Sequence, residues 1–369
     1  MEDKQHVPFD ELLEDRTKEG TKLQTSEYSA DGLHPIIDQG QKDIAGYTDR
    51  EDGIFPVVPC IVFGDHTRVI KYVDKPFFLG ADGVKVLCPK TASNNTKYLY
   101  YALNSVKIPD TGYNRHYKWL KEARITVYSK EKQDKLVSIF ELIDDLISLR
   151  KKQLQKLDDL VKSRFVEMFG DPVINPKHWN VRSLQDMGDC KNGMNFHHDD
   201  SGVDIHCLGV GDFQNLSIIT DVSMLSMVSL NEMPSDEYML QDEDIVFVRS
   251  NGNEALVGRC VAVYPGTIPT TFSGFCIRYR KRDESITTQY VLRVLKTDSM
   301  RAKMAGRGAN IQNLNQQILG SLNIPIPPIE LQKQFADFVS YVDKSKLTVQ
   351  QGLDKLELLK QSLMQKYFG

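Results

Sequence analysis

The chain has 369 residues, of which 41% are hydrophobic and 26% charged, a composition typical of a soluble protein with two or three domains. No apolar run approaches the ~20 residues that a membrane-spanning helix requires, and the polar start MEDKQHVPFDELL lacks the pattern of a signal peptide. The net charge of −4 does not by itself indicate a nucleic-acid-binding protein. We expect a cytoplasmic protein that makes no contact with a membrane.

The six cysteines are scattered along the chain without a CxxC pair. This spacing argues against a zinc ribbon and against a disulfide framework. We therefore expect buried, reduced thiols.

The first predicted domain, residues 1–123, contains polar loops whose side chains suit the edges of bases. Arg pairs well with guanine, Asn and Gln pair with adenine, and aromatic rings can pack on sugars or bases. A polar loop more often simply faces solvent, so each loop alone is a weak signal. The candidate DNA contacts here are Gln39, Gln41, Arg68, Asn114, Arg115, His116, Tyr117 and Lys118.

Residues 124–170 are predicted to form a central helix with a heptad seam. Either the helix docks on its own domain, or it pairs with a second long helix; we favour pairing because little neighbouring domain is left to cover the seam. The helix itself is expected to run about 36 residues within this segment, so at 1.5 Å per residue it is ~54 Å long, which matches ~16 base pairs of B-DNA. The seam residues are Phe140, Ile143, Ile147, Leu154, Leu157 and Val161.

The second predicted domain, residues 171–323, has its charges separated along the sequence. Residues 232–244 contain Asp and Glu but no Lys or Arg, whereas Lys and Arg predominate in residues 278–307. We expect one acidic and one basic face, and a basic face can attract phosphate. The candidate DNA contacts in this domain are Arg249, Asn251, Asn253, Arg307, Asn310, Gln312 and Asn313.

The last segment, residues 324–369, repeats the central helix. Laying residue 170 on residue 369 aligns residues 123–170 with 322–369 without a gap, and "FVEMFG" meets "MQKYFG". Shorter matches extend upstream, so we interpret the chain as two copies of one unit, each a globular part followed by a long helix. We expect the two helices to form an antiparallel coiled coil. In this segment the predicted seam or partner-docking residues are Val342, Leu353, Leu356 and Leu363.

Motifs of catalysis are absent from the sequence. It contains no P-loop, no complete dinucleotide or S-adenosylmethionine loop, no Asn-Pro-Pro-aromatic motif and no HExxH. His197-His198-Asp199-Asp200, with Asp204, His206 and Cys207, could form a metal site. The spacing matches no standard pattern of ligands, so we interpret this cluster as a polar loop and predict no metal.

These features resemble the specificity subunit of type I restriction–modification systems. The resemblance covers nearly the whole chain and is carried most specifically by SRFVEMFGDP, IPIPPIELQKQF, DQGQKDIAGYTD and LVGRCVAV with TFSGFCIRYR. It implies a mixed α/β fold with two target-recognition domains, separated by two long antiparallel coiled-coil helices. Any arm before the first domain is expected to be short.

The resemblance also implies a function. Each domain would read one half of a bipartite, asymmetric site in double-stranded DNA, and the helices would dock two methyltransferase subunits. Those partners would bind S-adenosylmethionine and methylate adenine, while this chain would bind no cofactor and catalyse nothing. A motor and nuclease subunit would complete the restriction enzyme. Two alternatives remain: a catalytic protein with an unrecognised site, and a coiled-coil adaptor that does not read DNA.

Overall fold

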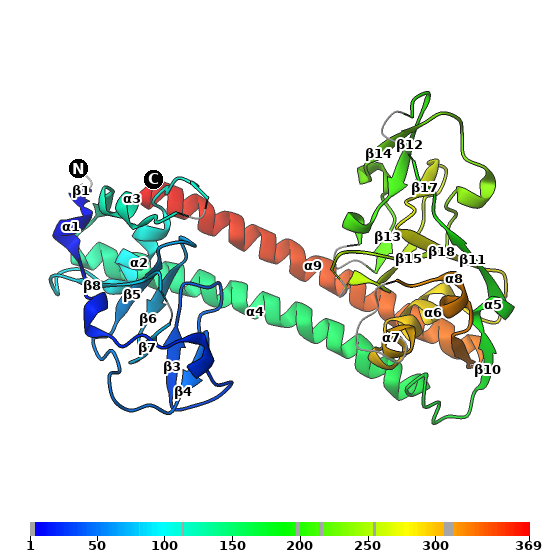
Figure 1. Cartoon of the computed structure of the whole chain (residues 1–369), viewed down its shortest axis with the longest axis horizontal. Coiled ribbons are helices and arrows are strands. Elements are labelled where there is room, and N and C mark those ends of the chain that lie inside the picture. The colour runs from blue at the N-terminus through cyan, green and yellow to red at the C-terminus, as the bar shows by residue number, and fades with distance from the viewer. Residues whose placement is uncertain are drawn as a thin grey trace. The chain divides into compact units, whose positions relative to one another are not determined.

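The computed structural model describes residues 4–80, 82–112, 114–196, 200–213, 217–253, 256–305 and 313–369. The chain divides into two compact units (Figure 1). Unit 1 consists of residues 1–153 and 349–369, and unit 2 consists of residues 154–348. Both long helices therefore contribute one part to each unit.

In its described residues, unit 1 contains three small sheets and three short α-helices. Its strands form a four-stranded sheet in the order β2-β8-β5-β6, a three-stranded sheet β4-β3-β7 and a pair β1-β9. The strands are β1 (Gln5–Pro8), β2 (Leu13–Asp15), β3 (His34–Ile37), β4 (Gly46–Thr48), β5 (Cys60–Gly64), β6 (Ile70–Val73), β7 (Phe78–Leu79), β8 (Val84–Pro89) and β9 (Arg124–Val127). The short helices are α1 (Phe9–Leu12), α2 (Thr96–Asn104) and α3 (Tyr117–Lys121).

Unit 2 repeats this arrangement with additions. Its sheets have the orders β11-β18-β15-β16-β13, β14-β12-β17 and β10-β19. The strands are β10 (Asn180–Ser183), β11 (Gly188–Asn192), β12 (Val203–Leu208), β13 (Ile218–Ile219), β14 (Met227–Leu230), β15 (Asp244–Val248), β16 (Cys260–Val263), β17 (Thr270–Phe272), β18 (Cys276–Lys281) and β19 (Asn323–Ile326). The short helices are α5 (Leu184–Met187), α6 (Thr288–Leu295), α7 (Asp298–Ala305) and α8 (Gln316–Gly320).

The matching sheet orders confirm the predicted tandem repeat. The sheet β2-β8-β5-β6 corresponds to β11-β18-β15-β16, and in both three-stranded sheets the central strand pairs antiparallel on one side and parallel on the other. Strand β13 and helix α7 are the clearest additions in unit 2. The mixed α/β fold class is likewise confirmed.

Residues that are identical in the two repeats make the same hydrogen bonds. The Gln133 amide accepts from Asn95 N and donates to Tyr128 O, while the Gln332 amide accepts from Thr287 N and donates to Pro327 O. Both glutamines are buried, with 1% and 0% of their surface exposed. Each one satisfies backbone groups at the start of a short helix and at the entry to a long helix, groups that would otherwise be left unpaired away from water.

Two tyrosines add a second repeated bond. Tyr98 Oη donates to Thr126 O at 2.7 Å, and Tyr290 Oη donates to Pro325 O at 2.9 Å. These bonds tie α2 to β9 and α6 to β19, so the short helix, the strand and the long helix of each unit form one packed layer.

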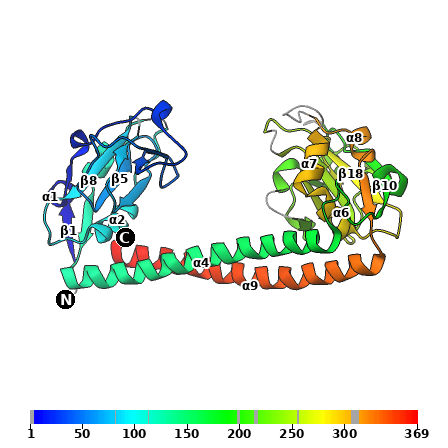
Figure 2. The same cartoon turned by 90° about the horizontal axis from the view of Figure 1, so that it is seen from below.

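The long helices are α4 (Lys130–Phe169) and α9 (Ile329–Phe368). Within each unit their segments lie side by side and run antiparallel (Figure 2). In unit 1, Asp144 pairs with Lys360 at 2.5 Å and Lys151 pairs with Glu357 at 3.0 Å. In unit 2, Asp158 of α4 pairs with Lys346 of α9 at 2.7 Å. The residue number falls along α9 as it rises along α4, which is the mark of an antiparallel pair.

Aromatic side chains anchor the ends of the long helices in the two cores. Phe368 packs against Tyr98 and Phe140 in unit 1, with ring centroids 5.3 and 5.7 Å apart. Phe169 packs against Tyr290 and Phe335 in unit 2, at 4.8 and 5.5 Å. The repeated Phe-Gly sequence therefore marks two equivalent core positions.

The helix boundaries differ from the sequence prediction. Residues 124–127 form β9, which pairs with β1, so the central helix begins only at Lys130. The compact units also divide within the long helices, between Gln153 and Leu154 and between Thr348 and Val349. Helix α4 ends at Phe169, and the next residue, Gly170, has a φ of +79°, a conformation that glycine adopts without strain.

The cysteines lie as expected from the sequence. Cys60, Cys88, Cys207, Cys260 and Cys276 are buried and Cys190 is half-buried, and all six, which lie in described residues, are free thiols. Among the described residues, no helix is long and apolar enough to cross a membrane.

Candidate nucleic-acid interface

In unit 1 the candidate DNA contacts gather around the turn between β5 and β6. His116 N donates to Asp65 O at 2.8 Å, and Tyr117 N donates to Asp65 Oδ1 at 2.7 Å. Arg68, at the end of the turn, pairs with Asp110 at 2.8 Å. These bonds bring two loops that are distant in sequence to one end of the sheet. Arg68 has a φ of +63°, a strained conformation for a residue with a side chain.

Besides Arg68, three of the predicted contacts in unit 1 are buried or half-buried and engaged within the protein, and the exposed Asn114 donates to Thr111 O. The Gln39 amide accepts from His66 N and donates to Asp82 O, so it holds two loops together. His116 is buried, with Nδ1 3.0 Å from Asp65 O. Tyr117 packs against the core beside Phe9 and Phe63. The structure gives these side chains a role in shaping the loops.

The remaining predicted contacts of unit 1 face solvent. Gln41, Asn114, Arg115 and Lys118 are exposed. Arg115 is close enough to Asp82 to help lower the pKa of that carboxyl, after the larger effect of Lys22. These four side chains, together with the partly exposed Arg68, are the groups of this loop cluster that can reach a ligand.

Unit 2 builds an equivalent loop cluster at the end of β15. Leu314 N donates to Arg249 O at 2.8 Å, which repeats the bond from His116 N to Asp65 O in unit 1. The Arg249 guanidinium donates to Gly274 O at 3.3 Å, and Asn251 Oδ1 accepts from Asn253 N in a local turn. Asn253 and Asn313 are exposed, whereas Arg249 and Asn251 are half-buried.

Sequence reasoning missed one residue of the unit 2 cluster. Phe275, next to Gly274 in the turn before β18, is 60% exposed, and its carbonyl accepts from Arg249 N at 2.7 Å. An exposed ring at this position can stack on a base or a sugar. The available signal was an aromatic residue in a glycine-containing turn. Arg307, Asn310 and Gln312 lie outside the described residues.

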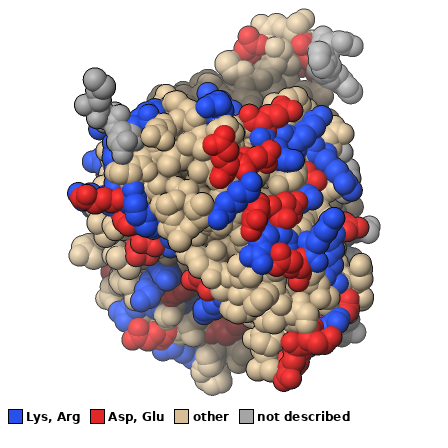
Figure 3. All heavy atoms as spheres, turned by 90° about the vertical axis from the view of Figure 1, so that its left-hand side faces the viewer, with Lys and Arg blue, Asp and Glu red and all other residues tan. Residues whose placement is uncertain are grey.

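The prediction of separate acidic and basic faces in unit 2 fails at the sheet, where the cations of residues 278–282 are paired with carboxylates. Strands β15 and β18 are antiparallel neighbours, so the acidic run at the start of β15 lies beside the basic run at the end of β18. Arg280 pairs with Asp244 at 2.7 Å, and Lys281 pairs with Glu243 at 3.0 Å. The charges largely neutralise each other. Charges are similarly mixed on the face drawn in Figure 3, where Lys and Arg alternate with Asp and Glu.

The predicted absence of a metal site is not settled by the structure. His197, His198 and Asp199 lie outside the described residues, and no group of three possible metal ligands occurs among the residues that are described. His206 and Asp204 have other partners: the His206 ring contacts Leu225 O at 3.1 Å, and Asp204 accepts from Ser229.

The seam residues named from the sequence face the interior of the helix pair. Phe140, Ile143, Val161, Val342 and Leu353 are buried, and the other five are half-buried. The buried five belong to the packing of the helices, and a role of the half-buried five in docking a partner stays a prediction.

An apolar row that the sequence reasoning missed lies beside the seam on α4. Leu142 is 61% exposed, and its row neighbours are exposed as well. The row is Ile139, Leu142, Leu146 and Leu149. Its steps of three and four residues could have been read from the sequence. A continuous exposed apolar row on a helix is the usual mark of a protein-binding surface.

Comparisons with known proteins agree with this architecture. Residues 176–358 match the family described as the type I restriction modification DNA specificity domain. This part of the chain is therefore a domain of the type I restriction–modification specificity family. Its likeness to the crystal structure of the S subunit from M. genitalium covers 99% of this chain and 96% of that one, with a TM-score of 0.58 and 17% identity.

Curated relatives show the same family over different lengths. The MjaX type I restriction enzyme specificity subunit of Methanocaldococcus jannaschii is 27% identical over 52% of this chain, and the match spans 46% of that relative, less than half its length. The EcoR124I/EcoR124II specificity subunit of Escherichia coli is 20% identical over 90% of this chain and 85% of its own length.

Proposed function

We propose that this chain is the DNA-reading subunit of a type I restriction–modification complex and reads a bipartite, asymmetric site. Each unit would read one half. The observation that carries this proposal is the repeated loop cluster, held in both units by an equivalent backbone bond, His116 N to Asp65 O and Leu314 N to Arg249 O. Two equivalent clusters with different side chains suit two different half-sites.

The side chains that would read bases are the exposed ones of each cluster. In unit 1 these are Asn114, Arg115, Gln41 and Lys118, and in unit 2 Asn313 and Asn253 with Phe275. Lys118 suits phosphate, whereas Arg115 and the amides suit base edges. The mixed surface charge supports a division of labour in which partner subunits supply part of the attraction for the DNA backbone.

Partner subunits would dock on the long helices. The exposed row Ile139, Leu142, Leu146 and Leu149 supports a helix-packing partner. We assign this role to two methyltransferase subunits, which would carry S-adenosylmethionine and methylate adenine, with motor and nuclease subunits joining them. This chain would itself be non-catalytic and bind no cofactor for methyl transfer.

Methylation sequencing tests this function directly. DNA is taken from cells that express the chain with its methyltransferase partner and from cells that lack this chain. We expect a two-part motif with methyl-adenine in both halves, which disappears without the chain. An unchanged methylome, with an active partner and an assembled complex, would refute the assignment.

A coiled-coil adaptor without sequence reading is the second candidate. The paired charges of β15 and β18 favour it, because they leave no basic face at that sheet. The two functions separate on the purified complex: an adaptor binds all duplexes equally, whereas a reader prefers its own site by a large factor.

A further inference from the structure

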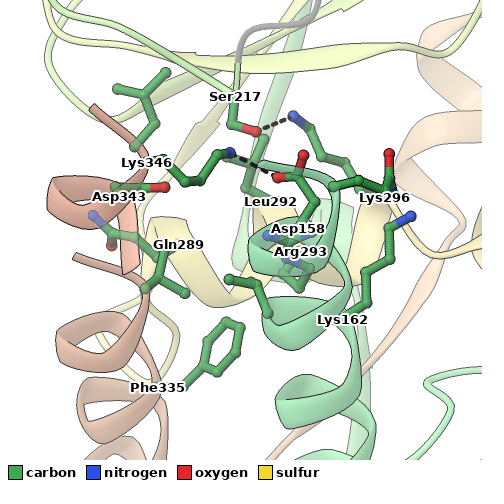
Figure 4. A pocket seen from close by; sticks show the side chains of 14 residues that line it. Asp158, Lys162, Ser217, Gln289, Leu292, Arg293, Lys296, Phe335, Asp343 and Lys346 are labelled. Atoms are coloured by element: carbon green, nitrogen blue, oxygen red, sulfur yellow. Dashed lines mark hydrogen bonds and ion pairs between the residues drawn. The ribbon is translucent and has the colours of Figure 1, made fainter. Parts of the chain in front are cut away.

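Unit 2 contains a pocket of about 470 Å³ between α6, α4 and α9 (Figure 4). Leu292, Phe335, Val161 and Val339 give it an apolar lining. Its charged lining is dominated by cations from all three helices. The described charged residues around the pocket are Lys162, Arg293, Lys296 and Lys346, opposed by Asp158 and Asp343.

The cations are incompletely matched by these carboxylates. Lys346 pairs with Asp158 at 2.7 Å, and Lys296 Nζ donates to Ser217 Oγ at 2.8 Å (Figure 4). Asp158 and Asp343 interact electrostatically with Arg293, but the Arg293 guanidinium donates no hydrogen bond to any described residue. Within the described residues, the pocket therefore offers the five N–H donors of an arginine without a protein acceptor.

Burial of the cations favours the binding of an anion at this site. Burial lowers the pKa of both Lys296 and Arg293, because it removes water from their charged forms. An anion placed beside them would interact more strongly than in bulk water. Lys162, Arg293 and Lys296 also line a second hollow of about 220 Å³, so these three cations can be approached from two sides.

The equivalent pocket of unit 1 shows that the fold does not require these cations. That pocket, of about 490 Å³, has Tyr101 at the repeat position of Arg293 and Asp144 at the position of Asp343. Tyr101 Oη donates to Asp144 at 2.9 Å, and Lys97 pairs with Glu141 at 2.6 Å. In unit 1 the carboxylate of Asp144 is therefore matched by a tyrosine hydroxyl and by Lys360, so the fold does not need an arginine at the position of Arg293.

We propose that the unit 2 pocket binds a small phosphate-bearing molecule, with Arg293, Lys296 and Lys162 around the phosphate and the apolar lining against the rest of the ligand. Three cations from two helices suit a doubly charged tetrahedral anion better than a single carboxylate, and arginine presents a fork that matches phosphate oxygens. The volume is within the range of small-molecule sites. This site is separate from the loop clusters proposed to read DNA.

The test is calorimetric titration of the full chain with three probes: AMP, inorganic phosphate and adenosine. We expect AMP to bind most tightly, phosphate more weakly and adenosine not measurably, with binding of AMP weakened by added salt. Arg293→Gln should reduce the affinity for AMP at least tenfold. Arg293→Tyr should do the same while keeping the fold, because it recreates the Tyr101–Asp144 pair of unit 1.

Lys333→Gln is the matched control. It removes one positive charge from α9 in the same unit, at an exposed position that does not line the pocket, and should leave the affinity for AMP unchanged. The proposal is overturned if neither AMP nor phosphate binds at millimolar concentration, or if adenosine binds as well as AMP. It is also overturned if folded Arg293→Gln and Arg293→Tyr bind AMP like the wild type, or if Lys333→Gln weakens binding equally.

Discussion

Units 1 and 2 agree where hydrogen bonds are buried and differ where side chains reach solvent or a pocket. Gln133 and Gln332 are identical because each satisfies the same backbone groups out of contact with water. Tyr101 and Arg293 hold equivalent positions, yet Tyr101 donates to Asp144, whereas Arg293 donates to none of the residues that the structure describes. The need to pair buried polar groups therefore keeps the same residues in both units. Residues that line pockets and loops are not restricted in this way and can differ between the units.

The largest expected effect comes from the two phenylalanines that end the long helices. Phe169→Ala and Phe368→Ala should each lower the free energy of unfolding by about 3–5 kcal/mol, because each leaves a cavity in a buried aromatic cluster. Hydrogen exchange, read separately for the two units, would measure both changes. The exposed Val166→Ala on the same turn of α4 should cost under about 0.5 kcal/mol. If either phenylalanine variant lost less unfolding free energy than Val166→Ala, Phe169 and Phe368 would not be equivalent core residues.

Loss of either buried glutamine should give the next largest effect on the free energy of unfolding. Gln332→Ala and Gln133→Ala each leave a backbone N–H at the start of a short helix and a carbonyl at the entry of a long helix without their partner, with an expected cost of about 2–3 kcal/mol. Chemical denaturation measures this cost, and exposed Gln334→Ala is the control. Similar midpoints for Gln332→Ala and Gln334→Ala would show that the repeated bonds contribute little.

Separate reading of the two half-sites should give an intermediate effect. Arg115→Ala should weaken binding by about 1–3 kcal/mol if it removes a base contact, and only at the half-site read by unit 1. Asn313→Ala should act on the other half-site alone. Competition binding with duplexes altered in one half measures both. Arg50→Ala, which removes an exposed arginine already paired with Asp52, is the control; an equal loss on all sequences would assign Arg115 to phosphate.

The smallest effect concerns acid stability and distinguishes unit 2 from unit 1. Hydrogen bonds from Ser285, with a further contribution from Arg182, lower the pKa of Asp283 to about 2, whereas Thr91 occupies the repeat position in unit 1. The stabilisation is complete above the unfolded pKa of about 3.9 and is lost as the pH falls through 2. After screening by solvent we expect about 1 kcal/mol.

Asp283→Asn tests this contribution. The variant should be less stable near neutral pH and should show a flatter loss of stability between pH 4 and pH 2, measured by denaturation at each pH. An unchanged slope in that window would exclude Asp283 as its source.

The sequence predicted the repeat because the identities sit at physically constrained positions. Gln133 with Gln332 and Phe169 with Phe368 are core and hydrogen-bonding residues, so their ungapped register reflects packing. The antiparallel pairing of the helices was also predicted correctly from the heptad seam. These features depend on local spacing, which a sequence displays directly.

The details of the candidate site depended on contacts between distant parts of the chain. His116 was a plausible base reader until its ring was found beside Asp65 O, on a turn fifty-one residues away. The charge runs cancelled because the register of β15 and β18 placed Asp244 beside Arg280. Composition and local periodicity do not reveal which residues from distant parts of the chain meet. The sequence therefore could not show which individual side chains are exposed to solvent.

The division of the long helices between the units has a consequence for synthesis. Unit 2 is a continuous stretch, residues 154–348, whereas unit 1 needs residues 349–369, including Phe368 in its core. A ribosome therefore makes the first part of unit 1 before unit 2 but supplies the segment that closes its core only after unit 2. Of these two units, the one that begins first is completed second, the reverse of the usual order in which the more N-terminal domain folds first.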